Sequence, residues 1–412
     1  MIDFDEIIDR AGTDSLKYDG GPVMNPYLPE KYLPMWVADM DFACPQPVLD
    51  AMKERLDRRI LGYSMLLDPG YFEIVTGWLW RRHGWRVDAD SIVFSSGVVS
   101  AMHTAVERLT KPGDGVLLNT PAYHPFDDTI KRFGRTPVYS PLLYRNGTYT
   151  IDYEDLEQKA KDPRNTLFFF CSPHNPTGRV WREEELRRVA QLCFANGVFL
   201  VCDEIHSDIL RKGETHIPLA KLFPEETQII TCTSPSKTFN LAGNQLANLV
   251  VADKALAREW RGMQACGFPN PLSIAACKAA YTQCDEWVAQ MNGYVDEKFC
   301  PRPAALARRS SKGANFPSAR GLILPGLTCA GLALPTGSSR NAFPGQDSLS
   351  SLGTNSWQTA KALCASIWPA PERLWKRPWI FWPAAWEKPI LSSKQTMPKR
   401  PGTNWFPAFF LL

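Results

Sequence analysis

One lysine, Lys237, lies at the centre of a segment rich in small hydroxyl side chains, Thr-Cys-Thr-Ser-Pro-Ser-Lys-Thr-Phe-Asn at residues 231–240. The segment directly follows an apolar run at residues 228–230, which is typical of the end of a β-strand. Serine and threonine hydroxyls can bind a phosphate while a lysine amine forms a covalent bond with a carbonyl carbon. The segment therefore fits the site of a phosphorylated aldehyde cofactor, although most lysines in such loops are solvated surface residues.

Three further polar side chains follow apolar runs in the same way as Lys237. They are Tyr123, Asn175 and Asp203, which come after the runs at residues 116–118, 167–171 and 198–202. Because ligands of a parallel sheet bind beyond the carboxyl ends of its strands, we predict that all four side chains line one crevice. His206, three residues after Asp203, is interpreted as either a residue of this site or a structural one.

A strand, a turn and a helix start in succession at residues 92–98. The apolar run Ile-Val-Phe at 92–94 leads into Ser-Ser-Gly at 95–97, and an amphipathic helix is predicted from residue 98. Such a turn presents free backbone amides and the positive end of a helix dipole, which together attract a phosphate. Many α/β proteins contain the same turn, so its specificity is low.

The alternation of short apolar runs with helical stretches predicts the fold class. Strands are predicted at residues 92–94, 116–118, 167–171 and 198–202, and further helices at 46–60, 71–83 and 183–196. The residues predicted to form the apolar face of the first helix are Val48, Leu49, Met52, Leu56 and Ile60. The pattern indicates an α/β protein with a mainly parallel sheet and helices on both faces.

With 412 residues, the chain is long enough for two domains and a sizeable core. Most of its 11 cysteines fall in apolar runs without a Cys-x-x-Cys pair, which fits buried thiols in a reducing compartment. The N-terminus has no signal-peptide pattern, and no stretch approaches about eighteen consecutive apolar residues. We therefore expect a soluble cytoplasmic protein with no membrane partner. The six histidines show no ligand spacing, so no metal site is predicted.

The final part of the chain differs from the rest in composition. Residues 301–412 carry 14 Lys or Arg and 3 Asp or Glu, whereas residues 1–300 carry 32 and 40. The same segment contains 14 Pro and 7 Trp but no Val, Tyr or His. No nucleic-acid-binding motif accompanies the basic residues and tryptophans, so no nucleic-acid partner is expected. We favour translation out of frame from about residue 300 over a divergent tail, and expect fewer buried contacts there than in residues 46–290.

Several motifs occur in a fixed order. They are Ser-Gly-Val at 96–98, Pro-Ala-Tyr at 121–123, Asn-Pro-Thr-Gly at 175–178, Asp-Glu-Ile-His at 203–206 and Ser-Pro-Ser-Lys at 234–237. With them, residues 30–295 resemble the fold-type I pyridoxal-phosphate enzymes of the class I/II aminotransferase superfamily. The segments Pro-Met-Trp-Val-Ala-Asp-Met-Asp-Phe at 34–42 and Ser-Lys-Thr-Phe-Asn-Leu-Ala-Gly at 236–243 are similar to the cystathionine β-lyase branch. Gln245, where aminotransferases of this superfamily have a phosphate-binding arginine, favours the same branch.

The resemblance implies a seven-stranded, mainly parallel sheet of the fold-type I kind, with a smaller α/β domain built from the two termini. Residues 1–45 would form an N-terminal arm and part of the small domain, and residues 46–290 the large cofactor-binding domain. Residues 291–412 would form the rest of the small domain, although their sequence does not match the family.

The resemblance also implies roles for single residues. Lys237 would bond covalently to pyridoxal 5′-phosphate and later move the substrate Cα proton, with Tyr123 stacked on the cofactor ring as its catalytic companion. Asp203 would pair with the pyridinium nitrogen and Asn175 with the ring oxygen O3′, while Trp36 would line the substrate pocket. The remaining cofactor-binding residues would be Gly97, Val98, Ser234, Ser236, His206 and, from the second subunit of a homodimer with shared sites, Tyr63.

The activity implied is β-elimination from an amino-acid thioether such as cystathionine, which releases a thiol (homocysteine), pyruvate and ammonia. An aminotransferase is an alternative because transamination begins with the same proton removal. In the family, an arginine of the C-terminal domain binds the substrate α-carboxylate, and none of the arginines here, including Arg340, Arg373 and Arg377, matches its motif. A cofactor-binding but catalytically impaired protein with a scaffold role is therefore a third alternative.

Overall fold

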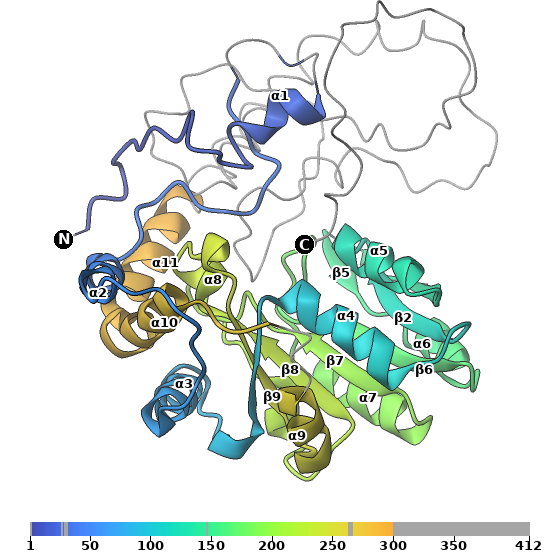
Figure 1. The fold of residues 1–412 in the computed structure, drawn as a ribbon. Helices are drawn as coiled ribbons and strands as arrows, with labels where there is room; N and C mark the ends of the chain where they lie inside the picture. The colour runs from blue at the N-terminus through green and yellow to red at the C-terminus, as the bar shows by residue number, and fades with distance from the viewer. Residues whose placement is uncertain (1, 26–27, 29–31, 146, 263–266, 300–412) are drawn as a thin grey trace, which may run out of the picture. The chain divides into compact units, whose positions relative to one another are not determined.

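The computed structural model describes residues 2–25, 28, 32–145, 147–262 and 267–299 (Figure 1). The prediction of fewer buried contacts after residue 300 lies outside the described residues. So does most of the segment 291–412 that is predicted to form the rest of the small domain. The helices are α1 (Gly20–Met24), α2 (Gln46–Asp57), α3 (Pro69–His83), α4 (Val98–Leu109), α5 (His124–Arg132), α6 (Tyr153–Ala160), α7 (Glu183–Ala195), α8 (Pro235–Thr238), α9 (Lys254–Gly262), α10 (Pro271–Gln283) and α11 (Asp285–Phe299).

The strands of the described residues form a seven-stranded sheet and a separate two-stranded one. The large sheet has the order β1-β9-β8-β7-β6-β2-β3. Its strands are β1 (Ile92–Ser95), β2 (Gly115–Thr120), β3 (Thr136–Pro141), β6 (Asn165–Cys171), β7 (Phe199–Asp203), β8 (Ile229–Thr233) and β9 (Ala247–Val251), and the small sheet pairs β4 (Leu143–Arg145) with β5 (Thr148–Thr150). In the large sheet only β9 runs antiparallel to its neighbours. The predicted mainly parallel sheet is confirmed.

Strand β6 shows why the sheet is covered on both sides. Leu167 and Phe169 point into one hydrophobic cluster, with α4, α5 and α9, while Phe168 and Phe170 point into another, with α6 and α7. Alternating side chains of a strand face opposite sides, and both sides are apolar here, so helices must cover both. Figure 1 shows this layered arrangement around the sheet.

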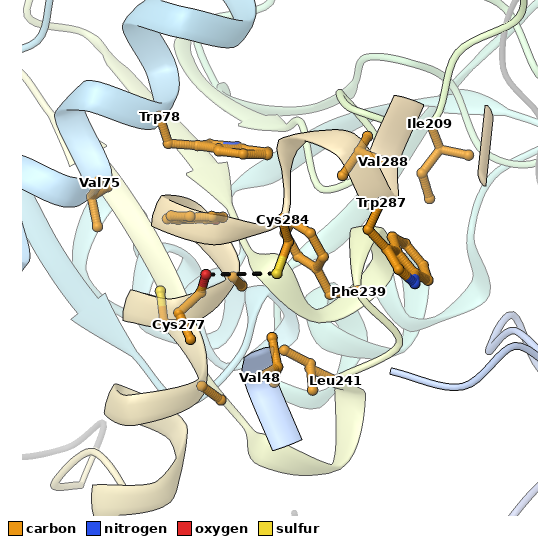
Figure 2. Packing of buried hydrophobic residues seen from close by; sticks show 14 of the residues in the cluster. Val48, Val75, Trp78, Ile209, Phe239, Leu241, Cys277, Cys284, Trp287 and Val288 are labelled. Carbon is orange, nitrogen blue, oxygen red and sulfur yellow. Dashed lines mark hydrogen bonds between the residues drawn. The ribbon is translucent and has the colours of Figure 1, made fainter. Parts of the chain in front are cut away.

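A third hydrophobic cluster joins α2, α3, α10 and α11 to the N-terminal segment (Figure 2). Trp78 of α3 stacks on Tyr281 of α10, with ring centroids 4.8 Å apart and planes 9° from parallel. Phe4 contacts the rings of Phe42 and Trp287 edge-on, at centroid distances of 5.0 and 5.7 Å. This cluster lies beside the chain segment that leaves β8, and it includes Phe239 of that segment.

The helix predicted at residues 46–60 is shorter in the structure. Helix α2 ends at Asp57, and Arg59 takes a left-handed backbone conformation with φ of 65°, which stops the helix. Of the predicted apolar face, Val48 is fully buried, but Leu56 is 47% exposed and Ile60, beyond the helix, is 74% exposed. No helix of the described residues has the length and hydropathy to cross a bilayer.

Candidate active site

The sheet brings the four predicted side chains to one edge. Strands β2, β6, β7 and β8 are adjacent and parallel, and Tyr123, Asn175, Asp203 and Lys237 lie at or just beyond their carboxyl ends. Asp203 is close enough to perturb the pKa values of both Tyr123 and Lys237. The sheet topology places the four residues at one edge, and their common crevice stays a prediction.

Lys237 lies in the short helix α8, directly after β8. Its Nζ donates a hydrogen bond to the backbone oxygen of Ala38, 2.9 Å away. Burial lowers the pKa of Lys237, and the negative charges of Asp39 and Asp203 oppose this in part. More of the amine is thus neutral at neutral pH than in an ordinary lysine, and the neutral amine is the form that acts as nucleophile or base.

Asp203 is a buried carboxylate whose hydrogen bond and cationic neighbour offset only part of the cost of burying its charge. Its side chain accepts a hydrogen bond from the backbone N–H of Ile205 at 3.1 Å, and the residue is only 5% exposed. Burial raises the pKa of Asp203 to about 6, against the opposing effects of that hydrogen bond and of Lys237. A buried carboxylate of this kind is stabilised by a nearby cationic N–H, which is what the protonated ring nitrogen of a pyridine cofactor provides.

Two buried polar atoms next to these residues have no hydrogen-bond partner in the part of the chain that the structure describes: Oδ1 of Asn175 and Nδ1 of His206. Both residues are nearly inaccessible, with exposed fractions of 6% and 3%. Burial, followed by the charge of Lys237, lowers the pKa of His206 to about 3, so its imidazole is neutral. Unpaired buried polar groups are costly, so they indicate a place for a polar ligand.

The N-terminus of α4 can accept an anion. No side chain caps this 12-residue helix at Gly97, and a Cβ placed on Gly97 would meet no atom of the described residues within 4 Å. Gly97 therefore has free space beside its Cα at the positive end of the helix, where an anion is favoured. Together with the unpaired atoms of Asn175 and His206, this start of α4 fits the polar groups of a phosphorylated pyridine cofactor.

The two predicted serine ligands differ in their surroundings. The Ser234 hydroxyl donates its proton to the backbone oxygen of Leu246 at 2.6 Å and accepts from the N–H of Ser236 at 3.1 Å. It therefore caps α8, and its only proton is already donated. Ser236 is half-buried at the start of α8. A phosphate role remains a prediction for both.

The remaining predicted residues lie in different environments. Tyr123 is half-buried at the start of α5, edge-on to the ring of Phe126 with centroids 5.8 Å apart. Tyr63, by contrast, is 96% exposed in the loop between α2 and α3, with its ring near Phe268. The structure thus does not bury Tyr63 with the other predicted residues. Trp36 is half-buried, and its indole N–H donates to the backbone oxygen of Lys17 at 3.1 Å.

Sequence reasoning missed the contact between Lys237 and the N-terminal segment. From the motif at residues 34–42 it selected only Trp36, whereas the atom that meets Lys237 is the backbone oxygen of Ala38. A backbone oxygen leaves no trace in residue type. The sequence does show an acid, Asp39, next to Ala38. In the structure its negative charge acts on Lys237 and raises the pKa of that lysine against the effect of burial.

Asp208, in the loop after β7, connects the site to α3. Its Oδ2 accepts hydrogen bonds from Trp78 Nε1 at 3.2 Å and from Thr238 Oγ1, next to the lysine, at 3.1 Å. Its Oδ1 accepts from Arg82 Nε at 3.2 Å and lies 3.3 Å from His83 Nε2. Burial alone would raise the pKa of Asp208, but His83 and Arg82 outweigh it and lower the pKa to about 2.

Replacing Asp208 with Asn should destabilise the protein by about 3–5 kcal/mol, because a buried ion pair loses one partner. Because the pKa of Asp208 is lower in the folded protein, its carboxylate stabilises the fold when the pH is above 3.8, the ordinary pKa of an aspartate. This contribution is lost as the pH falls towards 2. Denaturant unfolding at pH 7 and at decreasing pH measures both effects. Asp285→Asn, which breaks an exposed ion pair with Arg81, is the control and should cost less than about 1 kcal/mol. Equal losses in the two variants would contradict this prediction.

Comparison with known proteins connects this geometry to a family. The family model "Aminotransferase class I and II" matches residues 36–298. The chain belongs to this family. The match ends where the predicted resemblance stops, close to residue 299. Among the described residues, no group of three or more His, Cys, Asp or Glu side chains is arranged to bind a metal ion.

Individual relatives are similar over most of this length. Cystathionine beta-lyase PatB of Bacillus subtilis is 40% identical over 315 residues, which cover 76% of this chain and 81% of the relative. The PLP-bound C-S lyase of Staphylococcus hominis is 40% identical with a TM-score of 0.70, covering 76% and 78% of the two chains. Cystalysin of Treponema denticola, which contains pyridoxal 5′-phosphate, is 35% identical with a TM-score of 0.69 over 72% and 76%. The predicted fold type and the predicted resemblance to carbon–sulfur lyases are thereby confirmed.

Proposed function

We propose that this protein is a pyridoxal-phosphate enzyme that eliminates a thiol from a cysteine thioether such as cystathionine, with release of pyruvate and ammonia. The observation that carries the proposal is the edge of the sheet where Asp203 ends β7 and Lys237 follows the neighbouring parallel strand β8, with the buried side chain of Asn175 beyond β6. Similarity to a cystathionine β-lyase and to PLP-bound C-S lyases supports this cofactor and this reaction class.

When bound, pyridoxal phosphate withdraws electrons from the substrate Cα, which makes its proton removable and lets a thiolate leave from Cβ. The side chains of this site supply the rest. Asp203 would stabilise positive charge on the ring nitrogen, and Asn175 would donate from Nδ2 to the ring oxygen. The neutral amine of Lys237 accepts the Cα proton, and its hydrogen bond to Ala38 fixes the direction of the amine. Gly97 and Val98 would bind the phosphate through their backbone amides.

The protein should act as a homodimer in which Tyr63 reaches the site of the second subunit. An apolar stretch supports this assembly, because it is exposed in the single chain and large exposed apolar surfaces mark interfaces. Its exposed fractions are 74% for Ile60, 56% for Leu61, 96% for Tyr63, 56% for Met65 and 77% for Leu67. The stretch is anchored at Ser64, whose hydroxyl donates to the backbone oxygen of Pro269 at 2.7 Å.

Mixing two inactive variants tests whether sites are shared. Tyr63→Ala and Lys237→Ala subunits should each have little activity, whereas a mixed dimer has one site with an intact lysine and an intact tyrosine. After joint refolding, random pairing should restore about a quarter of the wild-type pyruvate release. One variant carries an affinity tag, so that co-purification of the untagged variant demonstrates mixed dimers. Activity of such a sample that merely equals the mean of the separate variants would contradict shared sites.

The reaction itself is tested by adding cystathionine to protein loaded with pyridoxal phosphate and measuring pyruvate, with Lys237→Ala as the control. Lysine-dependent pyruvate release supports the lyase. Conversion of the bound cofactor to pyridoxamine phosphate without pyruvate would instead support the aminotransferase. Cofactor binding that needs Lys237, with neither product, would support a catalytically impaired protein.

A further inference from the structure

Two segments far apart in sequence are joined next to the lysine, and one side chain makes most of the connections. Asn240, three residues after Lys237, accepts a hydrogen bond from the N–H of Met40 through Oδ1 at 3.1 Å. Its Nδ2 donates to the backbone oxygens of Met40 and Phe42, both at 3.0 Å. Asn240 therefore holds residues 40–42 against the chain segment that carries the lysine.

The backbone at Asn240 is itself held in place. Its φ of 59° lies in the left-handed region, which asparagine tolerates better than most residues. The neighbours on either side, Phe239 and Leu241, are 0% and 6% exposed and belong to the cluster of α2, α3, α10 and α11 (Figure 2). The amide of Asn240 is thus presented to residues 40–42 from a rigid turn.

Charged groups hold the same N-terminal segment through further hydrogen bonds. Lys17 is fully buried, and its Nζ donates to the backbone oxygen of Asp39 at 3.0 Å and to both carboxylate oxygens of Asp41 at 2.9 Å. Arg10 donates to the Asp39 carboxylate at 2.7 Å. Ala38 lies directly before these residues, so the contacts of residues 39–42 hold its backbone oxygen, which lies 2.9 Å from Lys237 Nζ.

We propose that Asn240 is a positioning residue for the reaction: by holding residues 40–42 it keeps the Ala38 oxygen opposite Lys237 Nζ, so that the amine is aimed at the substrate Cα. The proton leaves Cα for the lone pair of Nζ, while one N–H of the amine remains donated to Ala38. This inference rests on the proposed function. It assigns to the Asn240 side chain a task distinct from that of its backbone, which only needs to form the turn.

Asn240→Gly separates the two tasks, because glycine adopts the left-handed conformation freely but has no side chain to bind residues 40–42. Asp14→Gly is the matched control, since Asp14 also has a positive φ of 57° and is exposed on a loop. The first readout is the titration of Lys237 in cofactor-free protein, followed by the carbon-13 signal of its Cε and assigned by its loss in Lys237→Ala. The second is the separate measurement of kcat and KM for the substrate.

In Asn240→Gly the released segment should admit water to the amine, so the pKa of Lys237 should move upward towards its ordinary value. We also expect kcat to fall about 10- to 100-fold with KM changed much less, the effect of a misaligned base. Asp14→Gly should match the wild type in both. If the wild type shows no lyase activity, the proposed function fails, but the titration still tests the positioning.

A wild-type titration and kcat in Asn240→Gly would overturn the proposal and leave Asn240 a purely structural turn residue. If this variant cannot be purified, Asn240→Asp serves in its place. Aspartate keeps the size and the acceptor for the Met40 N–H, but it puts an oxygen where Nδ2 donates to Met40 and Phe42. It should reduce kcat at least as strongly, and an unchanged kcat there would equally refute the proposal.

Discussion

Lys237→Ala should reduce pyruvate release at least about 10³-fold and remove the visible absorbance that pyridoxal phosphate gains on binding. The single change removes both the group that bonds to the cofactor and the base that moves the substrate proton, so two contributions are lost together. Absorbance spectra and pyruvate assays of variant and wild type measure the two losses separately. The low exposure of the site and the lowered pKa of the lysine suit this double role.

Two further substitutions make this result specific. Lys237→Arg puts a permanent positive charge near Asp39 and Asp203 but cannot take over the covalent bond, so it should be as inactive as the alanine variant. Lys53→Ala removes an exposed lysine of α2 whose side chain is 67% accessible, and should leave spectrum and activity unchanged. Activity within about tenfold of wild type in Lys237→Arg would contradict the proposed role of Lys237.

Asp203→Asn should have opposite effects on activity and on stability. With cofactor bound, loss of the carboxylate leaves the ring nitrogen without its anionic partner, and we expect activity to fall about 10²-fold or more. Without cofactor, the same change should stabilise the protein at neutral pH by up to about 3 kcal/mol, because burial has raised the pKa of Asp203 from 3.8 to about 6. The carboxylate is thus costly in the empty fold.

The sign of this stability effect can be tested by pH. Since the pKa of Asp203 is higher in the folded than in the unfolded protein, its ionisation destabilises the fold fully above about pH 6 and not at all below about pH 4. Unfolding of cofactor-free protein should therefore show a stabilised Asp203→Asn variant at pH 7 that converges with the wild type near pH 4. Asp90→Asn, an exposed change before β1, is the control. A variant less stable than wild type at pH 7 would contradict the assignment.

The sequence allowed the sheet and its edge to be predicted because short apolar runs in parallel strands are nearly continuous and end in polar residues. Lys237, Asp203 and Asn175 were found in this way. Helix ends were harder, because the left-handed backbone of Arg59, which stops α2, has no signature in its residue type. Nor could pattern alone reveal that β9 returns antiparallel, since strand direction depends on the connection rather than on side-chain alternation.

The sequence could indicate candidate site residues whose side-chain type suits the chemistry. It could not indicate contacts that depend on a backbone atom or on which neighbours the fold brings together. The role of Ala38 depends on a backbone oxygen, and that of Ser234 on which atoms compete for its hydroxyl proton. Asn240 was part of a quoted motif, but its task is visible only when residues 40–42 lie beside it. The proposed role of Tyr63 involves a second subunit, whose contacts a single sequence does not reveal.

The antiparallel return of β9 has a consequence for the fluctuations of the lysine. Thr233 at the end of β8 pairs in register with Asn248 of β9, and its hydroxyl donates to the Asn248 backbone oxygen at 2.9 Å. The intervening residues, with Lys237 among them, form a loop whose two ends are bonded to each other, and the Ser234 hydroxyl closes it further at Leu246. A loop closed at its base has few conformations left to explore. The backbone of the lysine thus moves with the sheet, and residues 38–42 align the amine against a backbone that is already held.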